Sequence, residues 1–190
     1  MKTIAAILVA VALLISGASA ADFSKDSKAK EWGLQGEQKT LFSGKVVDVL
    51  CELAGDCADN CGSGNRYLGI VRDADNQLIY VLKNRQAAFN GATPDLLPYC
   101  NKQVDVDGVL IGDDDVVKTK FYMVQLIREK GAQMWNKTTI WTKDWEKKNP
   151  DAEGKGPWFR RDPRVAKQIA ETGHFGLGHE ADKKYLKENE

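Results

Sequence analysis

The amino-acid sequence has little of what several common kinds of function require. Its 190 residues carry no net charge, and a balanced charge disfavours nucleic-acid binding, which needs a strongly positive surface. No serine lies in a G-x-S-x-G motif, and no C-x-x-C-H sequence is present. These absences argue against an α/β-hydrolase and against covalently attached c-type haem. Carboxylates are plentiful, but nothing marks a pair for acid–base chemistry, and we predict no catalytic residue.

Long apolar runs are confined to the N-terminus. The run from Ile4 to Ile15 follows a single lysine and precedes the small residues Ala18–Ala20. This is the pattern of a secretory signal peptide, and the run is shorter than the roughly 20 residues needed to span a bilayer. We therefore predict a signal peptide over residues 1–20, cleaved after Ala20, a periplasmic or secreted location, and no membrane span in the mature chain.

Five segments between residues 41 and 131 have the composition of β-strands. Apolar residues alternate with polar ones in the first segment, and Asp and Asn residues between the second and third indicate a hairpin turn. Thr93 and Pro94 begin a short helical connector before the fourth segment, whose apolar positions change phase at Gly108, as at a β-bulge. The predicted strands are residues 45–53, 66–73, 78–84, 102–112 and 121–129.

The order of these elements is strand, strand, strand, short helix, strand, strand. This order is typical of the OB-fold, a five-stranded Greek-key barrel. We therefore predict a mainly β domain over residues 41–131, built as a five-stranded OB-fold-like Greek-key barrel. A five-stranded sandwich and an SH3-like barrel remain as alternatives.

Residues 21–40, before this domain, contain four acidic and four basic residues. They show little apolar periodicity and predict a solvated lead-in, with Trp32 docking onto the barrel.

The segment after the domain, residues 132–190, contains four of the five tryptophans and both histidines. We predict a partly helical extension that wraps the barrel and docks its tryptophans on it. Asp162 and Gly173 have the residue types that cap a helix at its start and its end. A last helix is predicted from about His179 to Lys187, and Trp141 and Trp145 are spaced for one face of an earlier helix.

The four cysteines predict two disulfides, because export places the chain in an oxidising compartment. In an OB barrel the first and fourth strands run antiparallel, so the end of one lies near the start of the other. This favours pairing of Cys51 with Cys100, and of Cys57 with Cys61. The rival pairing of Cys61 with Cys100 and Cys51 with Cys57 remains open, because a long loop can reach either way.

The spacing Cys57-x-x-x-Cys61 also admits other interpretations. As a disulfide it would pin the glycine-rich loop between the first two strands. As thiolates the two residues would bind copper or zinc, with His174 or His179 as a further ligand. As a thiol redox pair they lack the C-x-x-C spacing of thioredoxins.

The segment from Gly44 to Cys51, "GKVVDVLC", is followed by further cysteines and by a strand hairpin. In these features the chain resembles a group of small exported bacterial proteins that have an OB-like barrel, a G-x-V-V-D-x-x-C segment and a cysteine-rich first loop. The resemblance covers roughly residues 44–128. It implies the fold and the compartment, and it supplies no catalytic residue.

We therefore expect a non-enzymatic periplasmic binding or accessory protein, stabilised by disulfides, that binds an unidentified periplasmic protein or small ligand. Its interaction surface would combine Arg66 of the first loop with Trp158, Arg160 and Arg161 of the tail. The alternative role of the tail arginines Arg160 and Arg161 is to clamp the tail to the acidic barrel. The alternative function is a copper- or zinc-binding or thiol redox protein that uses Cys57 and Cys61.

Overall fold

The computed structural model describes residues 22–33, 36–83, 91–112, 120–152, 154, 158–173 and 179–189. The predicted signal peptide lies outside these ranges, as does His174. Among the helices in the described ranges, none combines the length and the apolar character that a bilayer crossing requires.

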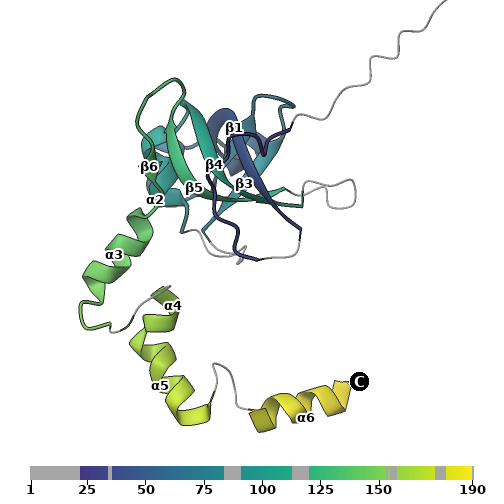
Figure 1. Cartoon of the computed structure of the whole chain (residues 1–190), viewed down its shortest axis with the longest axis vertical. Coiled ribbons are helices and arrows are strands. Elements are labelled where there is room, and N and C mark those ends of the chain that lie inside the picture. The colour runs from purple at the N-terminus through teal and green to yellow at the C-terminus, as the bar shows by residue number, and fades with distance from the viewer. Residues whose placement is uncertain are drawn as a thin grey trace, which may run out of the picture.

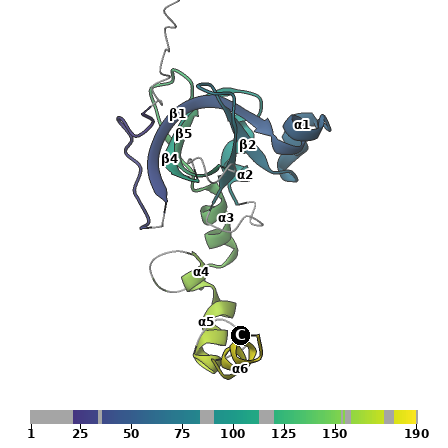
Figure 2. The same cartoon turned by 90° about the vertical axis from the view of Figure 1, so that its right-hand side faces the viewer.

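Five strands form a closed barrel, as Figure 2 shows from one end. The first strand pairs antiparallel with both the second and the fourth, and the third pairs with the second. The fourth pairs antiparallel with the fifth, and a parallel pairing between the third and fifth closes the ring. The strands are β1 (Glu37–Asp48), β2 (Leu68–Arg72), β3 (Leu78–Leu82), β4 (Gln103–Ile111) and β5 (Phe121–Glu129), with a short β6 (Asn136–Lys137) beside β5. The predicted mainly β, five-stranded barrel is confirmed.

Side chains fill the interior of the barrel. The rings of Phe42 and Tyr122 lie with their centroids 4.9 Å apart, and Tyr122 donates a hydrogen bond to the carbonyl of Thr40. Burial raises the pKa of Tyr122 well above its ordinary value, because the charged form would lose its hydration. Aliphatic side chains from all five strands complete the core, among them Val46, Ile70, Ile79, Val106 and Ile127.

A β-bulge lies opposite the predicted position, since Asp107 and Gly108 follow each other in β4 whereas their partners in β5 are Leu126 and Val124, so the extra residue is Gln125 of β5. The register between β4 and β5 shifts between Asp107 and Gly108. A bulge bends the strand that contains it, which a small barrel needs in order to close. The predicted hairpin of β2 and β3 and the predicted connector are also present, the latter as α2 (Thr93–Leu96) and the 3-10 turn η2 (Leu97–Tyr99).

The boundaries of the first strand differ from the prediction at both ends. β1 begins at Glu37, inside the segment expected to be a solvated lead-in, and it ends at Asp48. The chain then turns into α1 (Val49–Ala54), because the Asp48 carboxylate caps the backbone N–H groups of Leu50 and Cys51. Cys51 therefore lies on a helix and does not continue the strand.

The lead-in before β1 is bound to the barrel along residues 27–32, which we call the strap. Ala29 is buried against β4 and β5, and the Lys28 backbone N–H donates to the Asp107 carboxylate over 2.8 Å. Trp32, which was expected to dock onto the barrel, is 51% exposed. The small residue Ala29 thus makes the buried contact that the prediction assigned to the tryptophan.

The C-terminal segment is helical, and its predicted caps are confirmed. Asp162 accepts a hydrogen bond from the Arg164 backbone at the start of α5, and Gly173 ends this helix in the left-handed region. The pKa of Asp162 falls to about 2, chiefly because the Arg164 side chain donates to it. The helices are α3 (Ile140–Lys148), α4 (Trp158–Arg161), α5 (Pro163–Thr172) and α6 (His179–Asn189).

These helices do not wrap the barrel as expected. Figures 1 and 2 show α3 leaving the barrel beside α2, with α4, α5 and α6 extending further away. The rings of Trp141 and Trp145 lie 4.8 Å and 5.9 Å from that of Trp158, so three tail tryptophans pack on one another. The fourth, Trp135, lies against the barrel, with the Arg128 guanidinium of β5 4.2 Å from its ring centre.

A buried arginine supports the turn between β2 and β3. The Arg72 guanidinium is almost fully buried, donates to both carboxylate oxygens of Asp75 over 3.1 Å and 2.7 Å, and lies 4.4 Å above the Phe23 ring. The pKa of Asp75 lies below its ordinary value, chiefly because of the hydrogen bond from Arg72. A pKa that folding lowers adds stability above the ordinary carboxyl pKa, and this stability is lost as the pH falls through the lowered value.

Replacing Asp75 with asparagine should therefore destabilise the protein at neutral pH and not in acid. We expect the free energy of unfolding to fall by about 1–2 kcal/mol at neutral pH, since a hydrogen bond to a charged group is lost. The difference should vanish at a pH low enough to protonate Asp75 in the folded wild type. Urea unfolding at the two pH values measures both quantities, with Asp151→Asn on an exposed turn as the control. An equal loss at both values would contradict the assignment.

Candidate ligand-binding site

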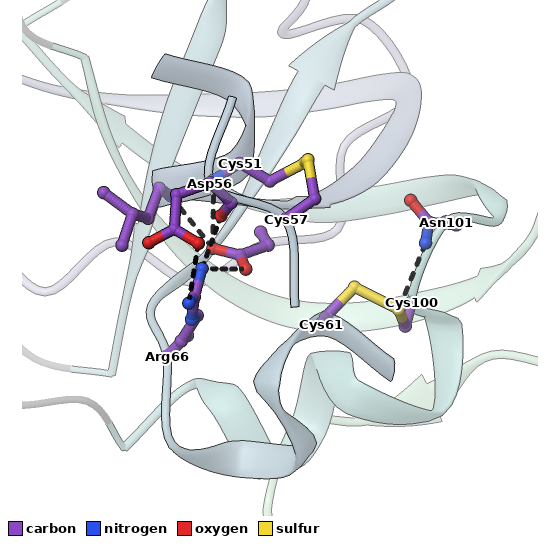
Figure 3. The surroundings of a disulfide bond; sticks show 9 residues. Cys51, Asp56, Cys57, Cys61, Arg66, Cys100 and Asn101 are labelled. Carbon is purple, nitrogen blue, oxygen red and sulfur yellow. Dashed lines mark hydrogen bonds and ion pairs between the residues drawn. A yellow bond between two sulfur atoms is a disulfide. The ribbon is translucent and has the colours of Figure 1, made fainter. Parts of the chain in front are cut away.

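The two disulfides organise the loop between β1 and β2. Cys51 is bonded to Cys57 and Cys61 to Cys100, with Cα–Cα distances of 4.3 Å and 5.9 Å (Figure 3). The preferred pairing of Cys51 with Cys100 is wrong, and the rival pairing is the one in the structure. The reason is α1, which carries Cys51 away from the end of β1, so that the later part of the loop brings Cys61 to Cys100.

The loop between these bonds adopts an unusual backbone. Its 3-10 segment η1 (Asp59–Gly64) contains Asn60, Cys61 and Ser63 at positive φ, between 46° and 50°. Such a conformation is unfavourable for residues other than glycine and persists only where the surroundings enforce it. The buried Cys61 and its disulfide to Cys100, at the end of η2, anchor this loop to the connector before β4.

Arg66 holds the beginning and the end of the loop together. Its guanidinium lies 3.1 Å from the Asp48 carboxylate, which caps α1, and 3.2 Å from the Asp56 carboxylate (Figure 3). It also donates to the Asp56 carbonyl. The pKa of Arg66 is raised, chiefly by the hydrogen bond to Asp56. Arg66 was predicted to face a ligand or partner, and the structure gives it these internal contacts.

The other predicted site residues do not converge with Arg66. Arg161 donates to Glu146 of α3 over 2.7 Å and lies 5.4 Å from the Trp145 ring centre, so it fastens α4 to α3. Trp158 belongs to the tryptophan cluster of the tail. The Arg160 and His179 side chains lie outside the described part of the structure, although the two residues belong to α4 and α6.

The metal-binding and thiol redox hypotheses both require Cys57 and Cys61 as a pair, and the structure does not pair them. Cys57 and Cys61 are bonded to different partners, and no cysteine in the described residues is free. No thiolate pair is therefore present to bind copper or zinc. Within the same residues, no three His, Cys, Asp or Glu side chains are grouped as metal ligands would be.

The candidate site that the structure reveals is an apolar cleft of about 340 Å³ on the barrel wall. It lies where β2, β3 and β5 meet, next to α1. The Tyr80 and Phe121 rings face each other across the pairing that closes the barrel, with centroids 6.1 Å apart. Among the described residues, no carboxylate, amine, imidazole or thiol lines the cleft, whose walls are Val49, Tyr67, Leu68, Tyr80, Val81, Leu82 and Phe121.

The cysteine-rich loop forms one wall of this cleft. Val49 begins α1, and Tyr67 follows Arg66 at the end of the loop. Gly69 lets α1 lie close to β2, since a Cβ at this position would stand 3.1 Å from the Val49 side chain. The Asp48 cap, the Arg66 contacts and the disulfides therefore fix the position of one side of the cleft.

Sequence reasoning did not identify the cleft residues. One signal for the cleft was present in the sequence. Side chains alternate along a strand, so the buried Ile79 and Val81 place Tyr80 between them on the outer face of β3. An aromatic side chain on the outer face of a barrel strand is a reason to look for a binding surface.

Comparison of the chain with protein-family models, with curated proteins and with solved structures finds no match.

Proposed function

We propose that the chain is an exported, non-enzymatic binding or accessory protein of the OB-fold type, and that the aromatic cleft is its ligand site. The observation that carries this proposal is the lining of the cleft, whose described residues are aromatic and aliphatic and include no carboxylate, amine, imidazole or thiol. The N-terminal signal pattern and the pair of disulfides support export, since disulfides persist in oxidising compartments.

The strand pairing supports the OB-fold assignment. β1 lies between β2 and β4, and β3 closes against β5. OB barrels bind their ligands over the second and third strands, together with the loop between the first and second. The cleft lies over β2 and β3 and borders that loop through Val49 and Tyr67.

The chemistry of the walls indicates the class of ligand. A neutral aromatic or aliphatic group would bury apolar surface and could stack on Tyr80 or Phe121, whereas a charged group would lose hydration without gaining a partner. Leu53, one helical turn beyond Val49 on α1, is 64% exposed and extends the apolar surface beyond the cleft. We assign the cleft to a neutral ring or apolar side chain, carried by a small molecule or by a partner protein.

The neutral fluorescent hydrophobe N-phenyl-1-naphthylamine tests this assignment. We expect saturable binding with one site per chain, detected as an increase in probe fluorescence. The Tyr67→Ala and Phe121→Ala variants should each bind at least about tenfold more weakly, which corresponds to the loss of one aromatic contact together with its buried area. Tyr67 is 40% exposed, so its truncation should leave the fold intact.

Met134→Ala is the matched control, because this side chain is 79% exposed and lies outside the cleft. The control should bind the probe like the wild type. Binding that does not saturate, or that is the same in the wild type, the Tyr67 variant and the Phe121 variant, would refute the cleft as the ligand site. Thermal unfolding of each variant establishes that a loss of binding is not a loss of folding.

A further inference from the structure

A second hollow, of about 390 Å³, lies between the strap and the edge formed by β5 and β6. The apolar part of its lining, which we call the floor, is Leu126 of β5 together with Val124, whose side chain is almost fully buried in the barrel core. Its walls carry four lysines and a tryptophan, and none of the described residues that line it is acidic. We call it the basic groove, and its lining is Lys28, Lys30, Trp32, Lys83, Val124, Gln125, Leu126, Lys137, Thr138 and Thr139.

The strap holds its part of this groove in a defined position. Gln125 of β5 accepts a hydrogen bond from the Lys30 backbone N–H over 2.9 Å and donates to the Lys30 carbonyl over 2.7 Å. Ala29, within the strap, is buried against β4 and β5. Because side chains alternate along an extended chain, anchoring Ala29 inward directs Lys28 and Lys30 outward, and Trp32 follows two residues later.

Three of the four lysines have charges available to a ligand. Lys83 pairs with Asp95 at 3.1 Å and donates to the Thr138 carbonyl. The ammonium groups of Lys28, Lys30 and Lys137 form no ion pair or hydrogen bond within the described residues. Two carboxylates also lie at the strap, but Asp107 and Glu37 accept hydrogen bonds from its backbone N–H groups.

This arrangement is unexpected for a chain with no net charge. Like charges gathered around one hollow repel each other, and an anion between them relieves that repulsion. Trp32, half exposed at the same hollow, offers a flat surface on which a ring can stack.

We propose that the basic groove is a second binding site, for an organic anion that carries a carboxylate or phosphate on a flat apolar body. The anionic group is bound by Lys28, Lys30 and Lys137, and the body lies on Trp32 and the apolar floor. This proposal is independent of the function assigned to the aromatic cleft, since the two sites share no residue.

Isothermal titration calorimetry with 2-naphthoate tests the groove, and the neutral 2-naphthol serves as the uncharged comparison. We expect 2-naphthoate to bind with one site, 2-naphthol to bind at least about tenfold more weakly there, and salt at about 500 mM to weaken the naphthoate complex, because screening acts on exposed charges. The triple variant Lys28→Gln, Lys30→Gln, Lys137→Gln should weaken naphthoate binding at least about tenfold. Trp32→Ala should weaken both ligands.

The matched control is Lys25→Gln, Lys45→Gln, Lys148→Gln, which removes three exposed lysines that do not line the groove. Naphthoate binding that survives the groove variant, or that the control weakens equally, overturns the proposal. The source of the anion is tested by co-sedimentation with phosphatidylglycerol vesicles. Sedimentation that the groove variant abolishes assigns the site to an anionic lipid headgroup, whereas naphthoate binding without sedimentation assigns it to a free anion. The absence of both kinds of binding refutes the site.

Discussion

Replacing Cys61 and Cys100 together with serine should lower the thermal unfolding midpoint by about 8–16 °C. Their disulfide joins residues that are 39 positions apart, and in the chain-entropy model a loop of this length stabilises the folded state by about 4 kcal/mol. For a chain of this size each kcal/mol shifts the midpoint by roughly 2–4 °C. The bond also holds the strained backbone of η1, and relief of this strain in the variant offsets part of the loss.

The double replacement of Cys51 and Cys57 is the matched control. Their bond closes a loop of six residues, so the same model assigns it only about 2 kcal/mol, and Cys57 is exposed whereas Cys61 is buried. Differential scanning calorimetry of both double variants should therefore show the larger decrease for the Cys61 and Cys100 pair. Equal decreases, or the reverse order, would show that loop length does not determine the contributions of these bonds.

Replacing Gly108 with alanine should destabilise the barrel by about 3 kcal/mol, at the upper end of the usual cost of overpacking. An added Cβ would stand 2.3 Å from the backbone oxygen of Met123 and 2.9 Å from the Tyr122 ring. Neither neighbour can move easily, since one is backbone within the β4–β5 ladder and the other is a fully buried ring. Chemical denaturation should show this loss as a lower midpoint with an unchanged dependence on denaturant.

Gly131→Asn tests whether the loss comes from crowding at Gly108 or from removing a glycine. Gly131 has a φ of 84°, which asparagine tolerates, and nothing lies within 4 Å of the position of its Cβ. This variant should lose less than about 1 kcal/mol. If Gly108→Ala proved as mild as the control, the bulge would be more plastic than the close contacts in the structure indicate.

Local patterns predicted much of the fold. The five strands and the capped helix after Asp162 depend on periodicity and on residues with distinct backbone preferences, whereas the bulge predicted at Gly108 lies in the opposite strand, at Gln125. These signals extend over a few residues, so the sequence contains them in full. The N-cap at Asp48 and the glycine at position 55, which bound α1, were signals of the same kind. Because the prediction did not use these two signals, the predicted first strand continued through Cys51 and the cysteines were paired incorrectly.

The two candidate sites could not be predicted in the same way, because each is assembled from distant segments. Tyr80 and Phe121 face each other only because β3 closes against β5 in parallel. The basic groove is formed by the strap together with residues near Lys137. The hydrogen bonds between Gln125 of β5 and the strap fix the position of the two segments relative to each other. Trp158 and Arg161, which were predicted to belong to an interaction surface, have partners within the tail.

The pairings β2–β3 and β3–β5 are the shortest in the ring of strands, with three residue pairs each, and we call the second the seam because no hairpin turn joins its strands. Three residue pairs, from Tyr80 with Phe121 to Leu82 with Met123, join β3 to β5, whereas nine pairs join β1 to β4. Opening of the barrel would begin where the fewest backbone hydrogen bonds have to break. The aromatic cleft spans this seam, so a bound ligand would contact both strands and hold them together. If the cleft binds its proposed ligand, we expect binding to slow amide hydrogen exchange along β3.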